Sequence, residues 1–140
     1  IIRFFGLSGW PEKNIVQRKS DAGLYKISSP ALTAIDLIHH QTKIGGMNRA
    51  ITILEELAEE ITETDIRELL TWYPHTSSLQ RFGYLLEELN APETHTSLVH
   101  QFLSKQNFYP VLLSPNSQQK AGGTGNRWKV DVNLELESDL

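Results

Sequence analysis

The sequence predicts an α+β fold, a compact bundle of about five helices with a small, mostly antiparallel sheet formed by strands near the two ends of the chain. Apolar residues recur at three- and four-residue intervals through the middle of the sequence, the spacing of helices with one buried face. Residues 128–136 alternate between apolar and polar types, and residues 1–6 are rich in β-prone types, so strands are expected at both ends. The 140 residues are expected to form a single domain.

The first part of the chain is expected to contain two short strands and a helix. One strand covers residues 1–6, and the other covers residues 24–27 and ends at the sequence Ser28-Ser29-Pro30. Ser29 is a suitable N-cap and Pro30 suits the first helical position, so a helix is expected over residues 30–41. Apolar residues cover most of the circumference of this helix, which predicts that it is buried.

The next two helices are recognised by their starts. Asn48 is expected to cap an amphipathic helix with glutamates on its outer side. Thr62 followed by Asp65 resembles a capping box, and this helix is expected to end at Pro74.

The remaining elements lie in the last half of the chain. Ser77 followed by Gln80 matches a capping box and starts a helix that ends near Asn90, and another helix is expected over residues 96–106. A short strand at residues 110–113 and a loop rich in Ser, Gln, Gly and Asn precede the strand at 128–136. The terminal strands are expected to meet in one antiparallel sheet that packs on the helices.

Composition excludes several classes of protein. The chain has no cysteine, so it has no disulfide framework, thiolate metal site or cysteine nucleophile. Its apolar stretches are far shorter than the roughly 20 residues that a membrane-spanning helix needs, and no secretion signal opens the chain, so a cytoplasmic location is expected. Because the chain starts at Ile1 and moves at once into an apolar run, we expect it to be a piece of a longer protein.

Charge is unevenly distributed. The formal net charge is −4, but residues 1–49 carry an excess of basic residues and the remainder an excess of acidic ones. Such a gradient would let the first third approach an anionic partner such as DNA, whereas the alternative is a solvated surface whose charges fell unevenly. The candidate DNA-contacting residues are Arg3, Lys13, Arg18, Lys19 and Lys26.

The histidines and carboxylates do not form a recognisable catalytic or metal motif. Adjacent His39 and His40 diverge on a helix, as do His95 and His100. Asp36 has the right spacing to share a metal with either of the first pair, but no sequence signal supplies a third ligand. Asp36 is therefore interpreted as a buried structural carboxylate that must be paired.

Three further features have structural interpretations. Arg81 is expected in the first turn of its helix, where the helix dipole disfavours a cation, so it is the first candidate partner for Asp36, with Arg49 second. Gly45-Gly46 precedes a helix and could hold an anion, although a helix cap and turn are favoured. The acidic run at residues 55–68 is interpreted as a solvated face.

Three segments taken together resemble a known family. They are Ser28-Ser-Pro-Ala-Leu-Thr-Ala-Ile-Asp-Leu37, Ile44-Gly-Gly-Met47 followed by Leu54-Glu-Glu-Leu57, and Gln80-Arg-Phe-Gly-Tyr-Leu-Leu-Glu87. In order and spacing they are similar to the C-terminal domain of AbiEi-type antitoxins from type IV abortive-infection toxin–antitoxin systems. The strand at 128–136, with Asn133, also resembles the end of that family.

The resemblance implies a bacterial transcriptional regulator that takes part in phage defence. Its N-terminal winged helix-turn-helix domain, expected to be missing from this chain, would bind promoter DNA, and its C-terminal domain would oppose a nucleotidyltransferase-like toxin, usually without a stable complex. The family offers no catalytic residues and no cofactor. The positions that match its motifs, expected mainly to hold the fold, are Ser29, Pro30, Thr33, Asp36, Gly45, Gly46, Arg81, Gly83 and Tyr84. The alternatives are an enzyme that uses Asp36 and the nearby histidines, with or without a metal, and a general protein-interaction module.

Overall fold

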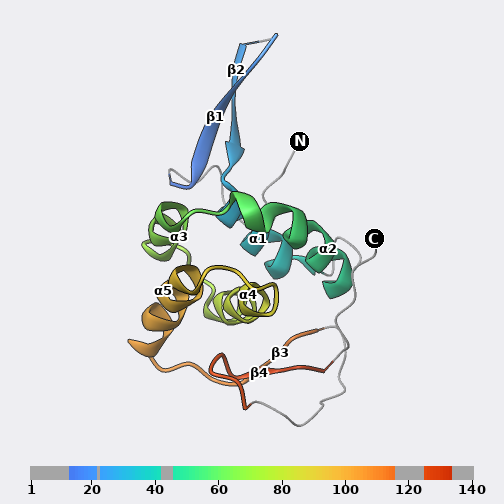
Figure 1. Ribbon diagram of the computed structural model, residues 1–140, viewed down its shortest axis with the longest axis vertical. Helices are drawn as coiled ribbons and strands as arrows, with labels where there is room; N and C mark the ends of the chain where they lie inside the picture. The colour runs from blue at the N-terminus through green and yellow to red at the C-terminus, as the bar shows by residue number, and fades with distance from the viewer. Residues whose placement is uncertain (1–12, 22, 42–45, 116–124, 134–140) are drawn as a thin grey trace.

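The computed structural model describes residues 13–21, 23–41, 46–115 and 125–133. In this part of the chain five helices form the body of the molecule, a β-hairpin projects from one end, and a short pair of parallel strands lies at the other (Figure 1). The predicted α+β class is therefore confirmed, with helices as the main component. The strand expected at residues 1–6 lies outside the described residues. No helix in the described part combines the length and the apolar character needed to cross a membrane.

The projecting hairpin consists of β1 (Ile15–Ser20) and β2 (Gly23–Ser28), which pair in antiparallel orientation. Its turn leads into Gly23, whose φ of 118° is a conformation that residues with a side chain rarely adopt. β2 contains the strand predicted at residues 24–27. β1 has no such signal in the sequence, because its two apolar residues, Ile15 and Val16, are adjacent and do not alternate.

Five helices and one short 3-10 segment make up the body. They are α1 (Pro30–His39), α2 (Met47–Leu57), the 3-10 helix η2 (Ala58–Glu60), α3 (Glu63–Leu70), α4 (Thr76–Glu88) and α5 (Glu93–Ser104). Helix α1 packs against α2, α3 and α4, while α5 packs against α3 and α4. Their facing sides supply most of the buried apolar side chains, so α1 and α4 lie at the centre of the packing.

Helix α1 begins as predicted. Ser29 Oγ accepts a hydrogen bond from the backbone nitrogen of Leu32 at 3.2 Å, and Pro30 occupies the first helical position. Most of its residues are buried, which confirms the expectation of a helix surrounded by protein. It ends at His39, two residues before the predicted boundary.

Two predicted caps are wrong. Gly46 rather than Asn48 is the N-cap of α2, because the carbonyl of Gly46 accepts the first helical hydrogen bond, at 3.2 Å from the nitrogen of Ala50. Likewise, helical hydrogen bonding in α4 starts at the carbonyl of His75, so Ser77 lies inside the helix.

The predicted N-cap of α3 at Thr62 is confirmed, whereas the Asp65 carboxylate bonds to Asn14 and to the backbone nitrogen of Ala31. Thr62 Oγ1 accepts a hydrogen bond from the backbone nitrogen of Asp65 at 3.1 Å. Helix α5 begins at Glu93, three residues earlier than predicted, directly after Pro92. A proline before a helix removes no hydrogen bond that the helix requires, so the helix extends to it.

The strands at the far end differ from expectation in their pairing. β3 (Val111–Leu112) and β4 (Val130–Asp131) are parallel. Within the described part, this pair and the hairpin are separate rather than joined in one sheet. The strict alternation expected from residue 128 also fails, because Lys129 has a φ of 55° and Asp131 is buried.

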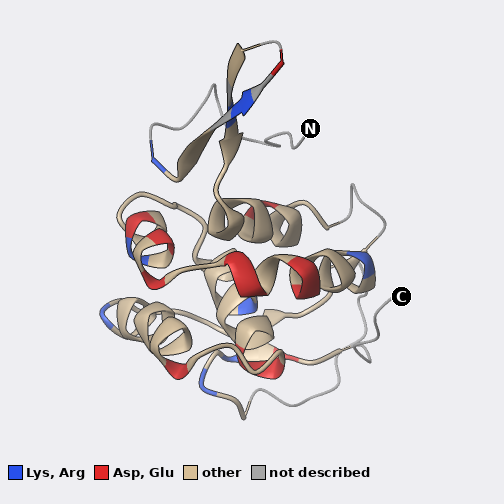
Figure 2. Cartoon of the chain, turned by 45° about the horizontal axis from the view of Figure 1, so that its top comes forward, with Lys and Arg blue, Asp and Glu red and all other residues tan. Residues whose placement is uncertain are grey.

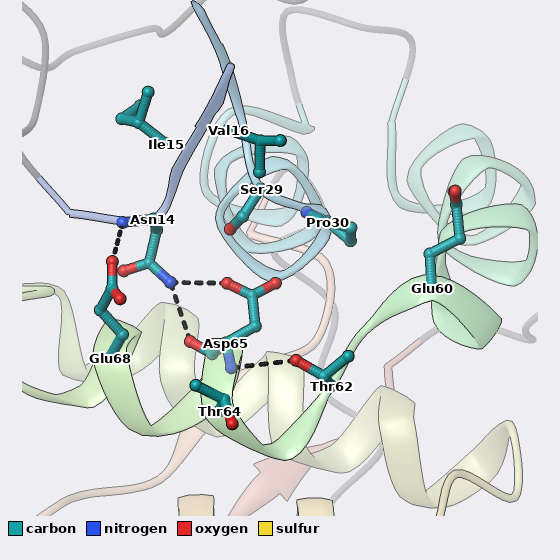
Figure 3. Close-up of a pocket in the computed structure, with 10 residues that line it drawn as sticks. All are labelled: Asn14, Ile15, Val16, Ser29, Pro30, Glu60, Thr62, Thr64, Asp65 and Glu68. Carbon is teal, nitrogen blue, oxygen red and sulfur yellow. Dashed lines mark hydrogen bonds between the residues drawn. The ribbon is translucent and has the colours of Figure 1, made fainter. Parts of the chain in front are cut away.

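Asn14 ties the hairpin to α3 (Figure 3). Its side-chain nitrogen donates to the backbone carbonyl of Asp65 at 2.8 Å and to the carboxylate of the same residue at 2.7 Å. Its side-chain oxygen accepts from the indole nitrogen of Trp72 at 2.7 Å, and its backbone nitrogen donates to Glu68. Asn14 is buried and has a φ of 59°, a left-handed conformation that asparagine tolerates better than most residues.

The same group reaches the start of α1. The second carboxylate oxygen of Asp65 accepts from the backbone nitrogen of Ala31 at 2.8 Å, which satisfies an orphan donor of the first turn. The carbonyl of Asn14 accepts from the backbone nitrogen of Ser29 at 2.7 Å. Asn14 and Asp65 thus fix the base of the hairpin to two helices at once.

Replacement of this asparagine should destabilise the whole domain. Asn14→Ala would leave the Trp72 indole nitrogen without its acceptor, would remove the donor to Oδ1 of Asp65 and would place alanine at a positive φ, so we expect a loss of about 3 kcal/mol in the free energy of unfolding. Urea denaturation followed by circular dichroism measures this loss. Asn14→Gly tolerates the positive φ, so it should be less destabilised than Asn14→Ala, by the part of the loss that is due to backbone strain. Gln17→Ala, on the exposed strand above, should change stability by less than about 0.5 kcal/mol, and equal stability of all three variants would contradict the assignment.

Candidate functional site

Aromatic and polar side chains gather where the end of α1 meets the start of α4. This histidine cluster comprises Asp36, His39, His40, Tyr73, His75 and Ser78. The rings of His39 and His75 stack with centroids 4.0 Å apart and planes inclined by 14°. His39 Nδ1 lies 2.7 Å from Ser78 Oγ, and the ring of His40 stands edge-on to that of His39 with centroids 4.5 Å apart.

Asp36 is buried, as predicted, with an exposed fraction of 4%. Its Oδ1 lies 3.7 Å from Nε2 of His40, one helical turn further on. The predicted pairing with Arg81 is wrong, because Arg81 Nε donates to the backbone carbonyl of Leu112 at 2.8 Å. Burial raises the pKa of the Tyr73 hydroxyl, and the nearby Asp36 carboxylate raises it further.

The cluster lacks the geometry of a metal site. Imidazole binds a metal through a lone pair in the plane of its ring, and the stacked rings of His39 and His75 direct their lone pairs along nearly parallel planes. No group of three or more histidine, aspartate or glutamate side chains in the described ranges is arranged to hold a metal ion. Ser78 and His39 resemble a nucleophile and base, but Ser78 has an exposed fraction of 0%, so a substrate does not reach it.

A second group on α4 holds the far end of the described chain. We call it the Trp128 clasp, and it comprises Gln80, Arg81, Gly83, Glu87 and Trp128. The indole of Trp128 is fully buried and lies directly on Gly83, where a Cβ atom would come within 2.3 Å of the ring. Gln80 Nε2 donates to the carbonyl of Trp128 at 2.9 Å, and the indole nitrogen donates to Glu87 Oε2 at 3.2 Å.

Arg81 completes the clasp by holding β3. It lies in the second turn of α4 rather than the first, since the helix begins at Thr76. Its hydrogen bond to the carbonyl of Leu112 spans 31 residues of sequence. Burial lowers the pKa of its guanidinium from the ordinary value. Arg81 therefore positions a strand and does not neutralise Asp36.

The motif residues at the start of α1 also have structural roles. Ser29 caps the helix and Pro30 starts it, as described above. Thr33 Oγ1 is hydrogen-bonded to the hydroxyl of Ser28 and fixes the exit of the hairpin. Gly46 is the N-cap of α2 at positive φ, and Gly45 lies outside the described residues.

The family assignment follows from comparison of the sequence. The family model described as the AbiEi antitoxin C-terminal domain matches residues 12–88, which is more than half of the chain. The chain belongs to this AbiEi antitoxin domain family. No curated protein matches it. No solved structure matches it either.

The AbiEi match contains all three motif segments and ends at Glu88. The strand at residues 128–136, which resembles the end of the family, lies outside the match. In the structure, however, motif residues Arg81 and Gly83 contact segments beyond residue 88, namely β3 and Trp128. The segments beyond the match therefore complete the packing of the AbiEi domain.

The candidate DNA-contacting residues of this AbiEi domain are brought together only in part. Lys19 and Lys26 are exposed on one face of the hairpin, because the strand register places Lys26 opposite Gln17, two residues before Lys19. Lys13 lies at the base of the hairpin, where its Nζ donates to Thr71 Oγ1 at 3.1 Å. Arg3 and the side chain of Arg18 lie outside the described residues.

A shallow hollow of about 360 Å³ lies between the hairpin base and α3 (Figure 3). Glu60, Asp65 and Glu68 line it together with hydroxyl-bearing residues. Asp65 and Glu68 are already committed to hydrogen bonds with Asn14. The hollow is therefore a consequence of the Asn14 junction and carries no ligand geometry of its own.

The sequence interpretation missed Asn14, Glu87 and Trp128 as positioning residues. A signal existed only for Trp128, because a tryptophan on an apolar face is expected to be buried. The side-chain partners of Asn14 lie more than 50 residues away in sequence, so local pattern does not reveal them.

The packing of Trp128 on α4 should be sensitive to a single methyl group at position 83. Gly83→Ala gains roughly 1 kcal/mol of helix propensity but places a Cβ inside the Trp128 ring, and displacement of that ring should outweigh the gain, for a net loss of about 2 kcal/mol in unfolding free energy. Tryptophan fluorescence during urea denaturation measures it. Gly125→Ala is the matched control, because a Cβ there meets nothing within 4 Å. Combining Gly83→Ala with Trp128→Leu should cost less than the sum of the two changes; strict additivity would count against the contact.

Tyr73 should make the domain sensitive to alkali. Burial raises the pKa of Tyr73 in the folded chain above its ordinary value of 10.0. The stability of the folded state is therefore fully retained below about pH 10 and falls as the hydroxyl ionises in the unfolded state above that pH. Tyr73→Phe should therefore lose less stability than the parent between about pH 9 and pH 11, as measured by urea midpoints across this range. Tyr109→Phe, which alters an exposed ring, should behave like the parent. Parallel loss in Tyr73→Phe and the parent would show that another group causes the effect.

Proposed function

We propose that this chain is the antitoxin half of a type IV abortive-infection system and counters a nucleotidyltransferase-like toxin without catalysing a reaction. The observation that carries the proposal is the AbiEi antitoxin domain match over residues 12–88. A winged helix-turn-helix domain outside these 140 residues would bind the promoter and repress the shared operon in the bacterial cytoplasm.

The motif residues hold the fold, which supports a function performed by the exposed surface of the domain rather than by these side chains. Ser29 caps a helix, and Gly83 leaves room for the ring of Trp128. Arg81 is hydrogen-bonded to the backbone of β3. The competing enzyme hypothesis relies on Asp36 and the histidines, where Ser78, which lies beside a ring nitrogen of His39, is fully buried. Converging, accessible groups are what an active site needs, so this arrangement favours the antitoxin.

The hairpin would add DNA contacts to this function. Lys19 and Lys26 lie on the same exposed face, and a two-stranded ribbon fits the major groove of duplex DNA. Two lysines supply a weak contact with little sequence preference that weakens as salt rises. Specific recognition of the operator would belong to the winged helix-turn-helix domain.

Co-expression tests the proposal. Residues 1–140 produced together with the toxin encoded in the neighbouring reading frame should restore growth of cells that the toxin arrests. His39→Gln and Ser78→Ala should still protect, because neither side chain performs chemistry in this proposal, and circular dichroism of the purified variants verifies that they fold. Continued arrest in the presence of folded, abundant parent domain contradicts the antitoxin role. Loss of protection by a folded His39→Gln variant would move the assignment to an enzyme.

A further inference from the structure

Tyr109 is displayed to solvent on a fixed backbone. Among the described residues the exposed large hydrophobic side chains are Leu24 and Tyr109, and Tyr109 is 72% exposed. Gln80 of the Trp128 clasp donates to the carbonyl of Tyr109 at 2.8 Å. On the other side, Lys129 Nζ donates to the carbonyl of Phe108 at 3.0 Å. The ring therefore projects from a segment whose carbonyls are held both at Tyr109 and immediately before it.

Two lysines lie on the segments next to Tyr109. Lys129, at a φ of 55°, turns its ammonium group back across the ring of Phe108, 4.5 Å from the centroid. Lys105 is exposed at the C-terminal end of α5, four residues before Tyr109. In the described residues after α5 the acidic side chain is that of Asp131, which is buried. This edge of the molecule thus differs from α2 and α3, whose exposed charges are mainly acidic (Figure 2).

We propose that Tyr109, Lys105 and Lys129 form a contact site for single-stranded nucleic acid. An unpaired base would stack on the exposed ring, and the flanking phosphates would reach the two ammonium groups. This is the combination of aromatic platform and cations by which proteins bind single strands without reading their sequence. A fixed backbone reduces the entropy that is lost on binding, because the platform is already in place.

A duplex fits this edge less well than a single strand. Bases in a duplex are stacked on each other, so their faces are not available to an isolated tyrosine ring. The hairpin, by contrast, presents Lys19 and Lys26 on one exposed face of a two-stranded ribbon, a shape that fits the major groove of a duplex. The two surfaces therefore predict different preferences, a single strand at Tyr109 and a duplex at the hairpin, and the inference at Tyr109 does not depend on the antitoxin role.

The test is a titration of the full 140-residue chain into a fluorescein-labelled oligothymidylate of about twelve nucleotides, followed by fluorescence anisotropy at low salt. Tyr109→Ala should weaken binding by roughly 5- to 150-fold, the loss of one stacked base, whereas Tyr109→Phe should retain the affinity. Lys129→Gln should lower the dependence of log K on log salt by about 0.7. Leu24→Ala removes the other exposed large hydrophobic residue and is the matched control, with unchanged affinity.

Several outcomes would overturn the site. Absence of binding at the lowest salt, or equal affinities of the parent and Tyr109→Ala, would refute it. An equal loss in a Lys19→Gln, Lys26→Gln double variant would show general electrostatic attraction, and a duplex of the same length bound as tightly through Tyr109 would refute stacking. If Tyr109→Ala abolishes protection against the toxin but leaves oligonucleotide binding unchanged, the surface contacts protein instead. Near-ultraviolet circular dichroism verifies that each variant is folded.

Discussion

The packing of this domain depends on a glycine, Gly83, at the position where α4 contacts Trp128. Because α4 has no Cβ at that position, the Trp128 ring lies against the helix backbone and becomes fully buried. The carbonyl and indole nitrogen of Trp128 are then within reach of Gln80 and Glu87 on the same helix. The space left by this glycine thus allows the segment around Trp128 to pack on the central helix α4.

A second junction, at the opposite end of the molecule from the Trp128 clasp, is polar. At the base of the hairpin, Asn14 and Asp65 bring together one strand and the starts of α1 and α3 almost entirely through hydrogen bonds. An unpaired polar group at such a buried site is costly, so a junction of this kind specifies one geometry more strictly than apolar contact does. The two ends of the body are therefore held by different means, a buried tryptophan on α4 at one end and a hydrogen-bonded junction at the other.

Local features of this fold could be predicted from the sequence, and long-range ones could not. The start of α1 at Ser29-Pro30 and the cap at Thr62 depend on neighbouring residues, and both are as predicted. The parallel pairing of β4 with β3 depends on the Trp128 clasp, and no local pattern distinguishes it from antiparallel pairing. The assignment of Arg81 to Asp36 failed for a related reason. Charge matching suggests a partner, but a backbone carbonyl carries no signal in the sequence.

The span of the Trp128 clasp has a consequence for the order in which the domain is completed during synthesis. Gln80 and the carbonyl that it binds are 48 residues apart, so at typical translation rates α4 exists for roughly 2 to 10 s before Trp128 has been made. During that interval Gly83, Gln80 and Glu87 lack the contacts that they make with Trp128 in the complete domain. The nascent domain therefore has its hairpin and helices, which form from near neighbours, before it can close the face that carries Tyr109. Surfaces that depend on this closure become available only when synthesis of the domain is nearly complete.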